Sequence, residues 1–542
     1  RLLARGRVRA GVSVLDAARN PATRRVVAIV TLATALAVFS ADAMAVGQRN
    51  RVAAAEQEIG AARTLTMLNP ELTDVRAALA EVDPDGTQVT PVVRMIQPGV
   101  DAKETLAVVP DEFSRIALFP GGEPDDSTWD RLTTPEDTSI RFTASELTVD
   151  VVDSTLDSIE VDGERADVRL GLDLALDSGS ILRSTLGTVP ADRDTVSLRN
   201  AVACREGCRL VGIWVASLPG AEITGSATLR DLVAEPSGDV VALGPADQWQ
   251  GADDGRAGEL VASSSAPEEL TITTRGRGTA LLTLQHEWLP GVVPALVAGG
   301  LPPAGTPESF QLTALDGEYQ EAIQVGTLER VPASGPETNV ADLETLQRGR
   351  QVSPAALVEV WFADADPASY DEVAAALAER GITVAGTTTL DETVRGYDET
   401  TPAWSLQLAG LVGGVALLIA LLVLLVSAVS GWRLRTRDLA ALRMSGLSGR
   451  TVRRIAVAAQ LPAVLVGVLA GTVAGLLGAR LAMPLVPLFA IAPEVSSEDL
   501  STAWWAAGSA ALVALLVLGL GSVLIGRTLA ARAELRRLRE TM

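Results

Sequence analysis

Few residues in this chain have side chains suited to catalysis. Its 542 residues include one histidine, His286, and one lysine, Lys103, which lies in the sequence VDAKETL. The phosphate-binding motif GxxxxGK[ST] is therefore absent, so this polypeptide does not hydrolyse ATP by that route. A serine or cysteine hydrolase would need His286, but neither a GxSxG turn nor the zinc motif HExxH is present. We therefore expect no catalytic residues and interpret His286 as a structural or surface histidine.

The two cysteines, Cys204 and Cys208, lie four residues apart in the sequence ACREGCRL. In an oxidising compartment such a pair closes a small loop, here between two predicted strands, and we favour a disulfide over free thiols. A zinc site is disfavoured, because structural zinc usually has four ligands and only one histidine could join the two thiols. We therefore predict that this chain binds no metal ion and no other cofactor.

A dense group of charges lies at Arg433–Arg454, which contains seven arginines and one acid, Asp438. Short loops with this bias stay on the cytoplasmic side of a membrane. Gly446 would end a short interfacial helix that begins near residue 437, and Ser448 would cap the next helix. Four apolar residues can line the first of these helices: Leu439, Ala440, Leu442 and Met444. Such a helix fits a groove in a cytoplasmic partner; the alternative is that the arginines only hold anionic lipid.

Four apolar segments are each long enough to cross ~30 Å of hydrocarbon as a helix. We predict membrane spans at residues 26–46, 404–430, 455–489 and 504–525. Seven arginines precede the first segment, so its N-terminal side is cytoplasmic, and its length favours a span over a cleaved signal peptide. This topology leaves residues 1–25, 431–454 and 526–542 in the cytoplasm and residues 47–403 and 490–503 outside it.

Two features inside the spans need an interpretation. Gly467, Gly471 and Gly475 recur every four residues in the third span, which predicts a face for close helix packing. Asp42 lies near the outer end of the first span, where a carboxylate costs less than at the bilayer centre. We interpret Asp42 as an acid at the level of the headgroups rather than as a proton or substrate site.

The distribution of charge agrees with this topology. The three cytoplasmic segments together have a net charge of +15, and the rest of the chain has a net charge of -37. The basic parts would therefore face the cytoplasm and anionic lipid, and the acidic part would lie outside. An acidic outer part repels phosphate, which excludes nucleic acid as a partner.

The outer part begins with a helical stalk that continues from the first span. Residues 47–122 and 352–403 have complementary patterns, and we expect them to form one small α+β module rather than two unrelated units. The first part predicts a helix at 71–81, strands at 88–95 and 105–109 and a helical turn from 111; the second predicts a strand at 357–362, a helix at 368–380 and a strand at 383–386.

Residues 123–351 form an acidic, β-rich insertion in this module. The alternation in RADVRLGLDLALD predicts one buried face, formed by Val168, Leu170, Leu172, Leu174 and Leu176. Further short runs are separated by turn residues, at 195–203, 209–217, 226–232, 270–274 and 279–287. This spacing favours an antiparallel sandwich or jelly roll, which could bind a glycan or a peptide.

Five tryptophans of the outer part are candidates for a ligand surface. Core or loop packing is the commoner use of such residues, and stacking on a sugar is the alternative. The five are Trp129, Trp214, Trp249, Trp288 and Trp361.

The segment RTRDLAALRMSGLSGRTVRRIAVAAQLPAVLVGVLAGTVAGLLGARLA resembles the region between the second and third spans of FtsX/MacB-type ABC transporter permeases, the FtsX-like permease family. The pattern of that family is approximately Arg-x-Glu-x-x-x-Leu-(Arg/Lys)-x-x-Gly. Its positions are occupied here by Arg437, Asp438, Leu442, Arg443 and Gly446. Two residues depart from the family: Asp438 replaces the more usual Glu, and Gln460 stands where many members have Glu. The order of one span, a large outer domain and three spans is also similar, and indicates the C-terminal four-span half of a bacterial member.

The resemblance implies a multi-pass permease subunit in the bacterial cell membrane, the inner or plasma membrane. In the family, the cytoplasmic segment docks on a separate ABC ATP-binding subunit, which holds ATP and magnesium. Arg437, Asp438 and Arg443 would then supply polar pairing around the apolar contact. A second permease unit is also implied, either in a homodimer or as an upstream repeat of the same polypeptide.

We expect the mechanism to be mechanical transmission (mechanotransmission), in which ATP hydrolysis in the partner moves the outer domain. The result would be export or extraction of a lipoprotein, peptide or drug, or activation of a cell-wall enzyme. The alternative is a membrane-anchored receptor that binds an extracytoplasmic protein, peptide or glycan without an ATPase. The two functions differ at residues 433–454, where only a permease needs a protein partner.

Overall fold

A computed structural model of the chain describes residues 21–96, 103–120, 122, 124–132, 137–159, 163, 165–190, 194–252, 258–266, 268–276, 281–302, 305–430, 436, 441, 448–458, 461–493, 495 and 498–532. These residues form two compact units. The helical unit comprises the described residues up to Ala55 and those from Asp391 onward, and the β-rich unit comprises Glu56–Leu390. The chain therefore passes between the units twice.

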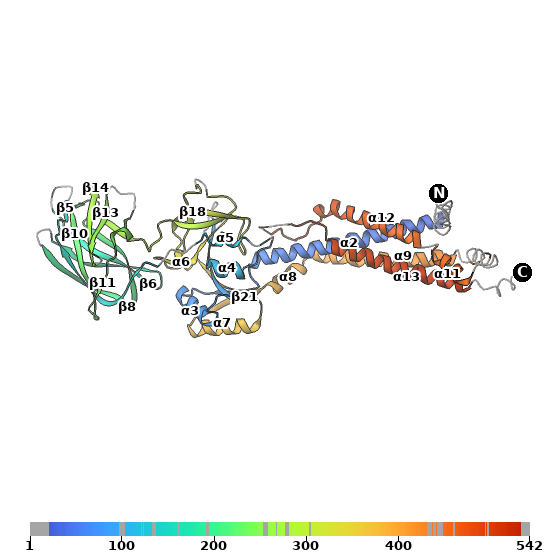
Figure 1. The fold of residues 1–542 in the computed structure, drawn as a ribbon, viewed down its shortest axis with the longest axis horizontal. Helices are drawn as coiled ribbons and strands as arrows, with labels where there is room; N and C mark the ends of the chain where they lie inside the picture. The colour runs from blue at the N-terminus through green and yellow to red at the C-terminus, as the bar shows by residue number, and fades with distance from the viewer. Residues whose placement is uncertain are drawn as a thin grey trace. The chain divides into compact units, whose positions relative to one another are not determined.

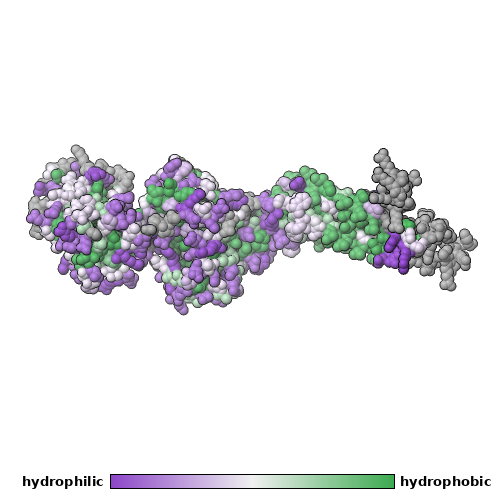
Figure 2. Space-filling view, viewed as in Figure 1, coloured by the Kyte–Doolittle hydropathy of each residue, from purple (hydrophilic) through white to green (hydrophobic). Residues whose placement is uncertain are grey.

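In the described part of the chain, four helical segments are long and apolar enough to cross a membrane. They contain α2 (Pro21–Ile59), α9 (Thr401–Ser430), α11 with α12 (Gly449–Ala458 and Leu461–Ala482) and α13 (Trp504–Arg532). Figure 1 shows these helices running alongside one another, and Figure 2 shows apolar side chains over most of their visible surface. Such a surface suits lipid rather than water.

Two of the predicted spans have different ends in the structure. The first does not stop at residue 46: α2 continues as one helix of 39 residues to Ile59. The prediction that the stalk remains helical to Leu68 is wrong in its last part, because β1 (Arg63–Met67) is a strand. The third, predicted to reach residue 489, ends its α-helix at Ala482 and continues as the short 3-10 helix η2 (Met483–Leu485). Pro484 and Pro487 explain the early end, because proline lacks the N–H that a continuing helix requires.

The β-rich unit contains a nine-stranded mixed sheet. Its order is β17-β18-β16-β19-β3-β2-β20-β1-β21, in which only the β16–β18 and β19–β3 pairs are parallel. The strands are β1 (Arg63–Met67), β2 (Val89–Met95), β3 (Glu104–Val108), β16 (Val293–Ala298), β17 (Phe310–Thr313), β18 (Tyr319–Leu328), β19 (Thr338–Asp342), β20 (Leu357–Phe362) and β21 (Val384–Thr389).

This sheet joins residues from both halves of the predicted module. β1 lies between β20 and β21, and β2 lies between β3 and β20, so the two halves form one sheet rather than two separate units. The predicted extent of the insertion, 123–351, is wrong at its C-terminal end. β16–β19 belong to the nine-stranded sheet, because β19 pairs with β3 along Thr338–Asp342.

Helices cover both faces of the nine-stranded sheet. On one face α3 (Leu72–Val82), α6 (Leu343–Gln347) and α7 (Pro367–Glu379) share a core. On the other, α4 (Pro110–Ile116) and α5 (Asp126–Trp129) pack around Phe113 and Trp129. The start of α7 has the residues that favour a helix N-terminus. The side chain of Asp366 caps it by accepting from the N–H of Ala368, and Pro367 occupies the first helical position.

The inserted strands form a second sheet of ten strands, in which all pairs are antiparallel. They pack their apolar side chains into one core that spans the sheet. The strands are β4 (Ile140–Val152), β6 (Val168–Leu176), β7 (Ile181–Val189), β8 (Thr195–Ala216), β10 (Ser226–Glu235), β11 (Asp239–Val241), β12 (Trp249–Gly251), β13 (Gly258–Ala266), β14 (Glu269–Gly276) and β15 (Leu281–His286). β5 (Asp157–Ile159) and β9 (Glu222–Thr224) form a separate pair.

Two predictions about this sheet need correction. The alternation in β6 predicted one buried face, but Gly171, Asp173 and Ala175 on the other face are buried as well. Part of the cover comes from Trp214, since a β-carbon on Gly171 would collide with its indole ring. The runs 195–203 and 209–217 are not two strands either, because both belong to β8.

The sulfur atoms of Cys204 and Cys208 are bonded to each other. The disulfide does not close a loop between two strands, as the sequence suggested. Instead it closes a bulge inside β8: Cys204 lies opposite Ala144 and Cys208 opposite Phe142, so three residues face a single residue of β4. Gly207 allows this bulge because its φ is +117°.

All five tryptophans of the outer part are buried, with at most 6 % of any of them exposed. They therefore pack in the described structure and offer no surface for stacking on a sugar. The histidine is structural: His286 is buried, its Nδ1 accepts from the N–H of Trp288, and its ring meets the edge of Trp249. Burial lowers the pKa of His286, which keeps the ring neutral at physiological pH.

Candidate functional site

The glycines predicted as a packing face in α12 lie directly against α2. A β-carbon on Gly467 would lie 2.7 Å from Val30, and one on Gly475 would lie 2.6 Å from the carbonyl oxygen of Ala35. At Gly471 the same atom would be 2.6 Å from the carbonyl oxygen of Thr31. The two helices therefore touch at three positions over about two turns, which only glycine permits at these positions.

Farther along α2, side chains hold the segment that precedes α13. Arg49 donates to the carbonyl oxygens of Asp499 at 2.7 Å and Ser501 at 2.8 Å. Asn50 donates to the carbonyl oxygen of Asp499 at 3.0 Å and accepts from its N–H at 2.8 Å. Hydrogen bonds from Ser501, together with Arg49, lower the pKa of Asp499, so its carboxylate stays ionised. We call Arg49, Asn50, Asp499 and Ser501 the clasp.

Two further contacts fix the same part of α2. Arg51 is buried and donates to the carboxylate of Asp398 at 2.7 Å, at the end of α8 (Leu390–Asp398). Only 2 % of Asp42 is exposed, and its carboxylate accepts from the N–H of Ala503 at 2.7 Å; its depth in a membrane stays a prediction. A carboxylate at the first residues of α13 stabilises the helix start, where N–H groups lack partners. Asp42 therefore has a structural partner.

The other end of α2 is anchored in the β-rich unit. Gln57 donates from its amide to the carbonyl oxygen of Val331 at 2.6 Å and accepts from the N–H of Ala333 at 2.7 Å. Gly60 ends the helix in the left-handed region, with φ of +77°, and a β-carbon there would lie 2.5 Å from the ring of Trp361. We call Gln57, Gly60, Val331, Ala333 and Trp361 the seat.

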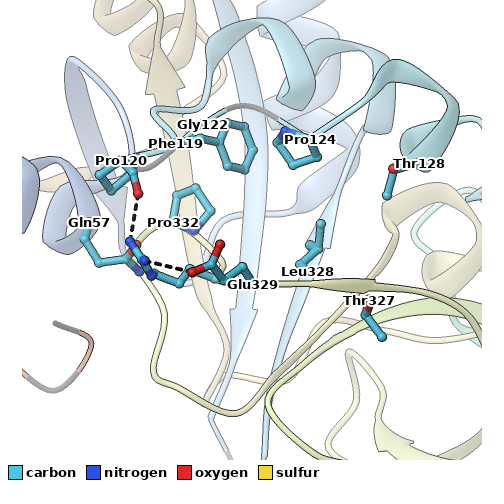
Figure 3. A pocket seen from close by; sticks show the side chains of 11 residues that line it. Gln57, Phe119, Pro120, Gly122, Pro124, Thr128, Thr327, Leu328, Glu329 and Pro332 are labelled. Atoms are coloured by element: carbon cyan, nitrogen blue, oxygen red, sulfur yellow. Dashed lines mark hydrogen bonds and ion pairs between the residues drawn. The ribbon is translucent and has the colours of Figure 1, made fainter. Parts of the chain in front are cut away.

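A cleft of about 370 Å³ flanks the seat and is shown in Figure 3. Gln57, Phe119 and Pro332 contribute to its walls. Arg330 bridges two of its sides, donating to the carbonyl oxygen of Pro120 at 2.9 Å and to the carboxylate of Glu329 at 3.0 Å. The cleft thus lies where the last turn of α2 meets two loops of the β-rich unit.

A series of polar side chains connects Trp361 of the seat to the neighbouring strands β2 and β3. The Trp361 indole donates to Glu359 at 2.8 Å, and Arg94 lies 4.0 Å from the same carboxylate. Arg94 also donates to Glu104 at 2.8 Å. Burial raises the pKa of Glu359, and the nearby Glu104 adds to this, whereas the Trp361 hydrogen bond and Arg94 act against it.

Glu359→Gln should raise the stability of the protein at neutral pH. The folded-state pKa of Glu359 lies above the ordinary value of 4.5, because burial disfavours the charged carboxylate. Its protonated form therefore stabilises the folded protein fully below about pH 4.5, and this contribution to the free energy of unfolding is lost as the pH rises through the folded-state pKa. Glutamine keeps an acceptor for Trp361 without the buried charge. We expect a higher Tm than wild type at pH 7 and a difference that shrinks toward pH 4.5.

Glu104→Gln is the matched control for this measurement. It should lower the Tm at pH 7, because Glu104 accepts from both Arg94 and the N–H of Gly335. An unchanged or lower Tm for Glu359→Gln at pH 7 would contradict the assignment of a buried, unfavourable charge.

Most of the residues predicted to couple to a partner lie outside the described residues: Arg437, Asp438, Leu439, Leu442, Arg443, Met444 and Gly446. Ser448 is described, and its hydroxyl accepts from the N–H of Thr451 at the start of α11. This is the cap expected from the sequence. Sequence reasoning missed the clasp and the seat; a glycine after a long helix, at Gly60, was the available signal for the seat.

Comparison with known proteins identifies the C-terminal part of the chain. The family model for the FtsX-like permease C-terminal domain matches residues 410–532, which include most of α9 and all of α11, α12 and α13. No curated protein matches the chain. Members of this family are typically non-enzymatic membrane components that work with an ABC ATP-binding subunit. Residues 410–532 therefore resemble the C-terminal domain of FtsX-like permeases, and this match is consistent with a permease of the FtsX/MacB type.

Proposed function

We propose that this chain couples ATP hydrolysis by a separate nucleotide-binding subunit to movement of its β-rich unit, which lies outside the cytoplasm. ATP and magnesium bind to the partner, and the chain itself supplies no catalytic group. Closure of the partner moves the cytoplasmic segment near Arg437–Gly446, and the helical unit passes this movement to α2. The output is mechanical work on a lipoprotein, peptide, drug or cell-wall enzyme.

The observation that supports this mechanism best is the anchoring of α2. It is a continuous helix that begins in the helical unit and ends in the β-rich unit, where the seat holds its last turn. The second passage between the units is also helical, through α8. Helices transmit displacement with little loss, since every turn is braced by its own hydrogen bonds. A flexible linker would not do so.

Charge and packing support the topology of the proposal. The bias of arginine toward short segments favours a cytoplasmic side for those segments and so supports an outer location for the acidic β-rich unit. The Cys204–Cys208 disulfide agrees with an oxidising compartment. A second permease unit completes the assembly, as a homodimer or an upstream repeat. The glycan receptor has no specific observation in its favour, because its tryptophans are buried.

The double substitution Leu442→Asp and Met444→Asp tests the coupling. We expect stimulation of the partner's ATPase to fall about tenfold or more, because burying unpaired carboxylates in an apolar contact costs several kcal/mol. The measurement is ATPase activity of the reconstituted assembly with and without the permease. Ala441→Asp is the control. Ala441 is exposed, so this substitution adds a carboxylate to the same segment without removing an apolar side chain from the predicted contact. Equal stimulation by the double variant and wild type would refute the coupling assignment.

The partner itself can be sought before any variant is made. The protein would be purified from native membranes in mild detergent, and co-purifying subunits would be identified by mass spectrometry. We expect a stoichiometric subunit with a GxxxxGK[ST] motif and ATPase activity in the complex. Reproducible absence of such a subunit, with the helical unit intact, would favour a receptor without an ATPase.

A further inference from the structure

Two neighbouring parallel strands of the nine-stranded sheet send their following helices to opposite faces. β3 and β19 are paired in parallel, with Val108 opposite Asp342 at their carboxyl ends. β3 leads into α4, which packs into the core around Phe113, whereas β19 leads into α6, which packs into the core on the other face. The carboxyl end of β3 therefore lies between helices that cover opposite faces of the sheet.

A cleft lies beside the carboxyl end of β3, on the side of β2 rather than of β19. Its volume is about 400 Å³, which falls in the range of small-molecule sites. Its walls come from α3, the start of β2, and the turn between β3 and α4, and they are mostly apolar. The residues that matter here are Arg76, Leu79, Val89, Pro91, Val109 and Glu112.

The charged groups that surround Glu112 in the cleft have hydrogen-bond or ion-pair partners elsewhere. Asp83 accepts from the N–H groups of Gln88 and Val89 and so holds the turn between α3 and β2. Arg76 lies 3.5 Å from Glu344 and donates to Gln347, both on α6.

Arg115 donates to the carbonyl oxygens of Asp85 and Gly86. Both arginines near Glu112 are thus bound to other partners. Burial raises the pKa of Glu112, and the negative charge of Asp83 raises it further. The hydroxyl of Thr90 and the positive charges of Arg76 and Arg115 lower the same pKa, but by less. A carboxyl group with a raised pKa in a cleft is typical of a functional site.

We propose that this cleft binds a cationic nitrogen carried on an apolar stem, with the Glu112 carboxylate as its counter-ion and Leu79, Val89 and Pro91 against the stem. The ligand is either a small amine or a basic side chain of a peptide. The site lies in the β-rich unit and goes beyond the proposed coupling function. It neither requires nor tests an ATPase.

The test uses the full-length protein in nanodiscs, with empty nanodiscs as the blank, and ligand-observed NMR. The probes are phenethylamine, the neutral 2-phenylethanol and the blocked peptide acetyl-Leu-Arg-Leu-amide. We expect the cationic probes to bind at least tenfold more tightly than 2-phenylethanol at pH 8. Their affinity should fall as the pH drops through the pKa of Glu112, because a protonated carboxyl no longer pairs with a cation. Tighter binding of the amine or of the peptide identifies the source, and either result supports the site.

Two variants and one control complete the design. Glu112→Gln should remove the preference for cations and the pH dependence, and Ala77→Trp should reduce binding of all probes by filling the cleft from an exposed wall position. Asp111→Asn is the matched control, because it removes a neighbouring exposed carboxylate of α4 and should change nothing. Equal affinity for charged and neutral probes, unchanged binding by Glu112→Gln, or no binding by any probe would each overturn the proposal.

Discussion

Gly471→Ala should destabilise the helical unit by about 1–3 kcal/mol, the usual cost of forcing an extra methyl into close packing. The new β-carbon would lie 2.6 Å from the carbonyl oxygen of Thr31 and 2.7 Å from the β-carbon of Thr34. One of these atoms is backbone, so rotation of a side chain cannot relieve the contact, and α12 must move away from α2. The measurement is thermal unfolding in detergent together with ATPase stimulation in the assembly, and both should fall.

Gly478→Ala is the matched control, because it makes the same change on the same helix. A β-carbon there would meet only Phe39, at 3.9 Å, which is an ordinary contact. Since alanine favours helix over glycine by up to about 1 kcal/mol, this variant should be neutral or slightly more stable than wild type. Equal effects of the two substitutions would show that helix propensity, and not the contact between α12 and α2, determines the result.

Gly60→Ala should produce the second large effect, at the seat. It combines the cost of a left-handed backbone at φ of +77° with a collision 2.5 Å from the ring of Trp361, which is fully buried. Backbone strain of this kind costs about 1–3 kcal/mol by itself, and the collision adds to it. We expect a lower Tm of the β-rich unit and loss of the coupled output even where the partner's ATPase is retained.

Gly238→Ala separates these two contributions. Its φ of +74° is nearly the same as that of Gly60, but nothing lies within 4 Å of the added atom. This variant should therefore show the backbone cost alone and leave coupling intact. If Gly60→Ala were no worse than Gly238→Ala in both measurements, the contact with Trp361 would have no role in anchoring α2.

Local patterns predicted the elements well but not their partners. The strand expected at 357–362 is β20, and the helices and strands expected in both halves of the module lie within a few residues of those in the structure. The error came at β16–β19, which were assigned to the insertion. A strand's alternation shows which side is buried but not which sheet it joins, since pairing depends on contacts far apart in sequence, such as Val340 with Leu106.

In the candidate site, too, features within one element could be predicted from the sequence, whereas contacts between distant elements could not. The glycine face of α12 was visible in the sequence, because its spacing follows the helix period. The clasp and the seat were not, since Asn50 reaches a backbone 449 residues away and Gln57 one 274 residues away. The coupling residues were assigned from the family resemblance, and the match to residues 410–532 supports the family rather than the role of each residue.

Because α2 is a single helix, an insertion within it changes the direction in which every later side chain leaves the helix. Each residue added to an α-helix turns everything beyond it by about 100° and moves it by about 1.5 Å. Asn50 in the clasp and Gln57 in the seat are seven residues apart, close to two full turns, so both side chains leave the helix on the same side. An insertion of one residue between Asn50 and Gln57 would turn their side chains about 100° apart on the helix, whereas an insertion of seven residues would leave them on the same side.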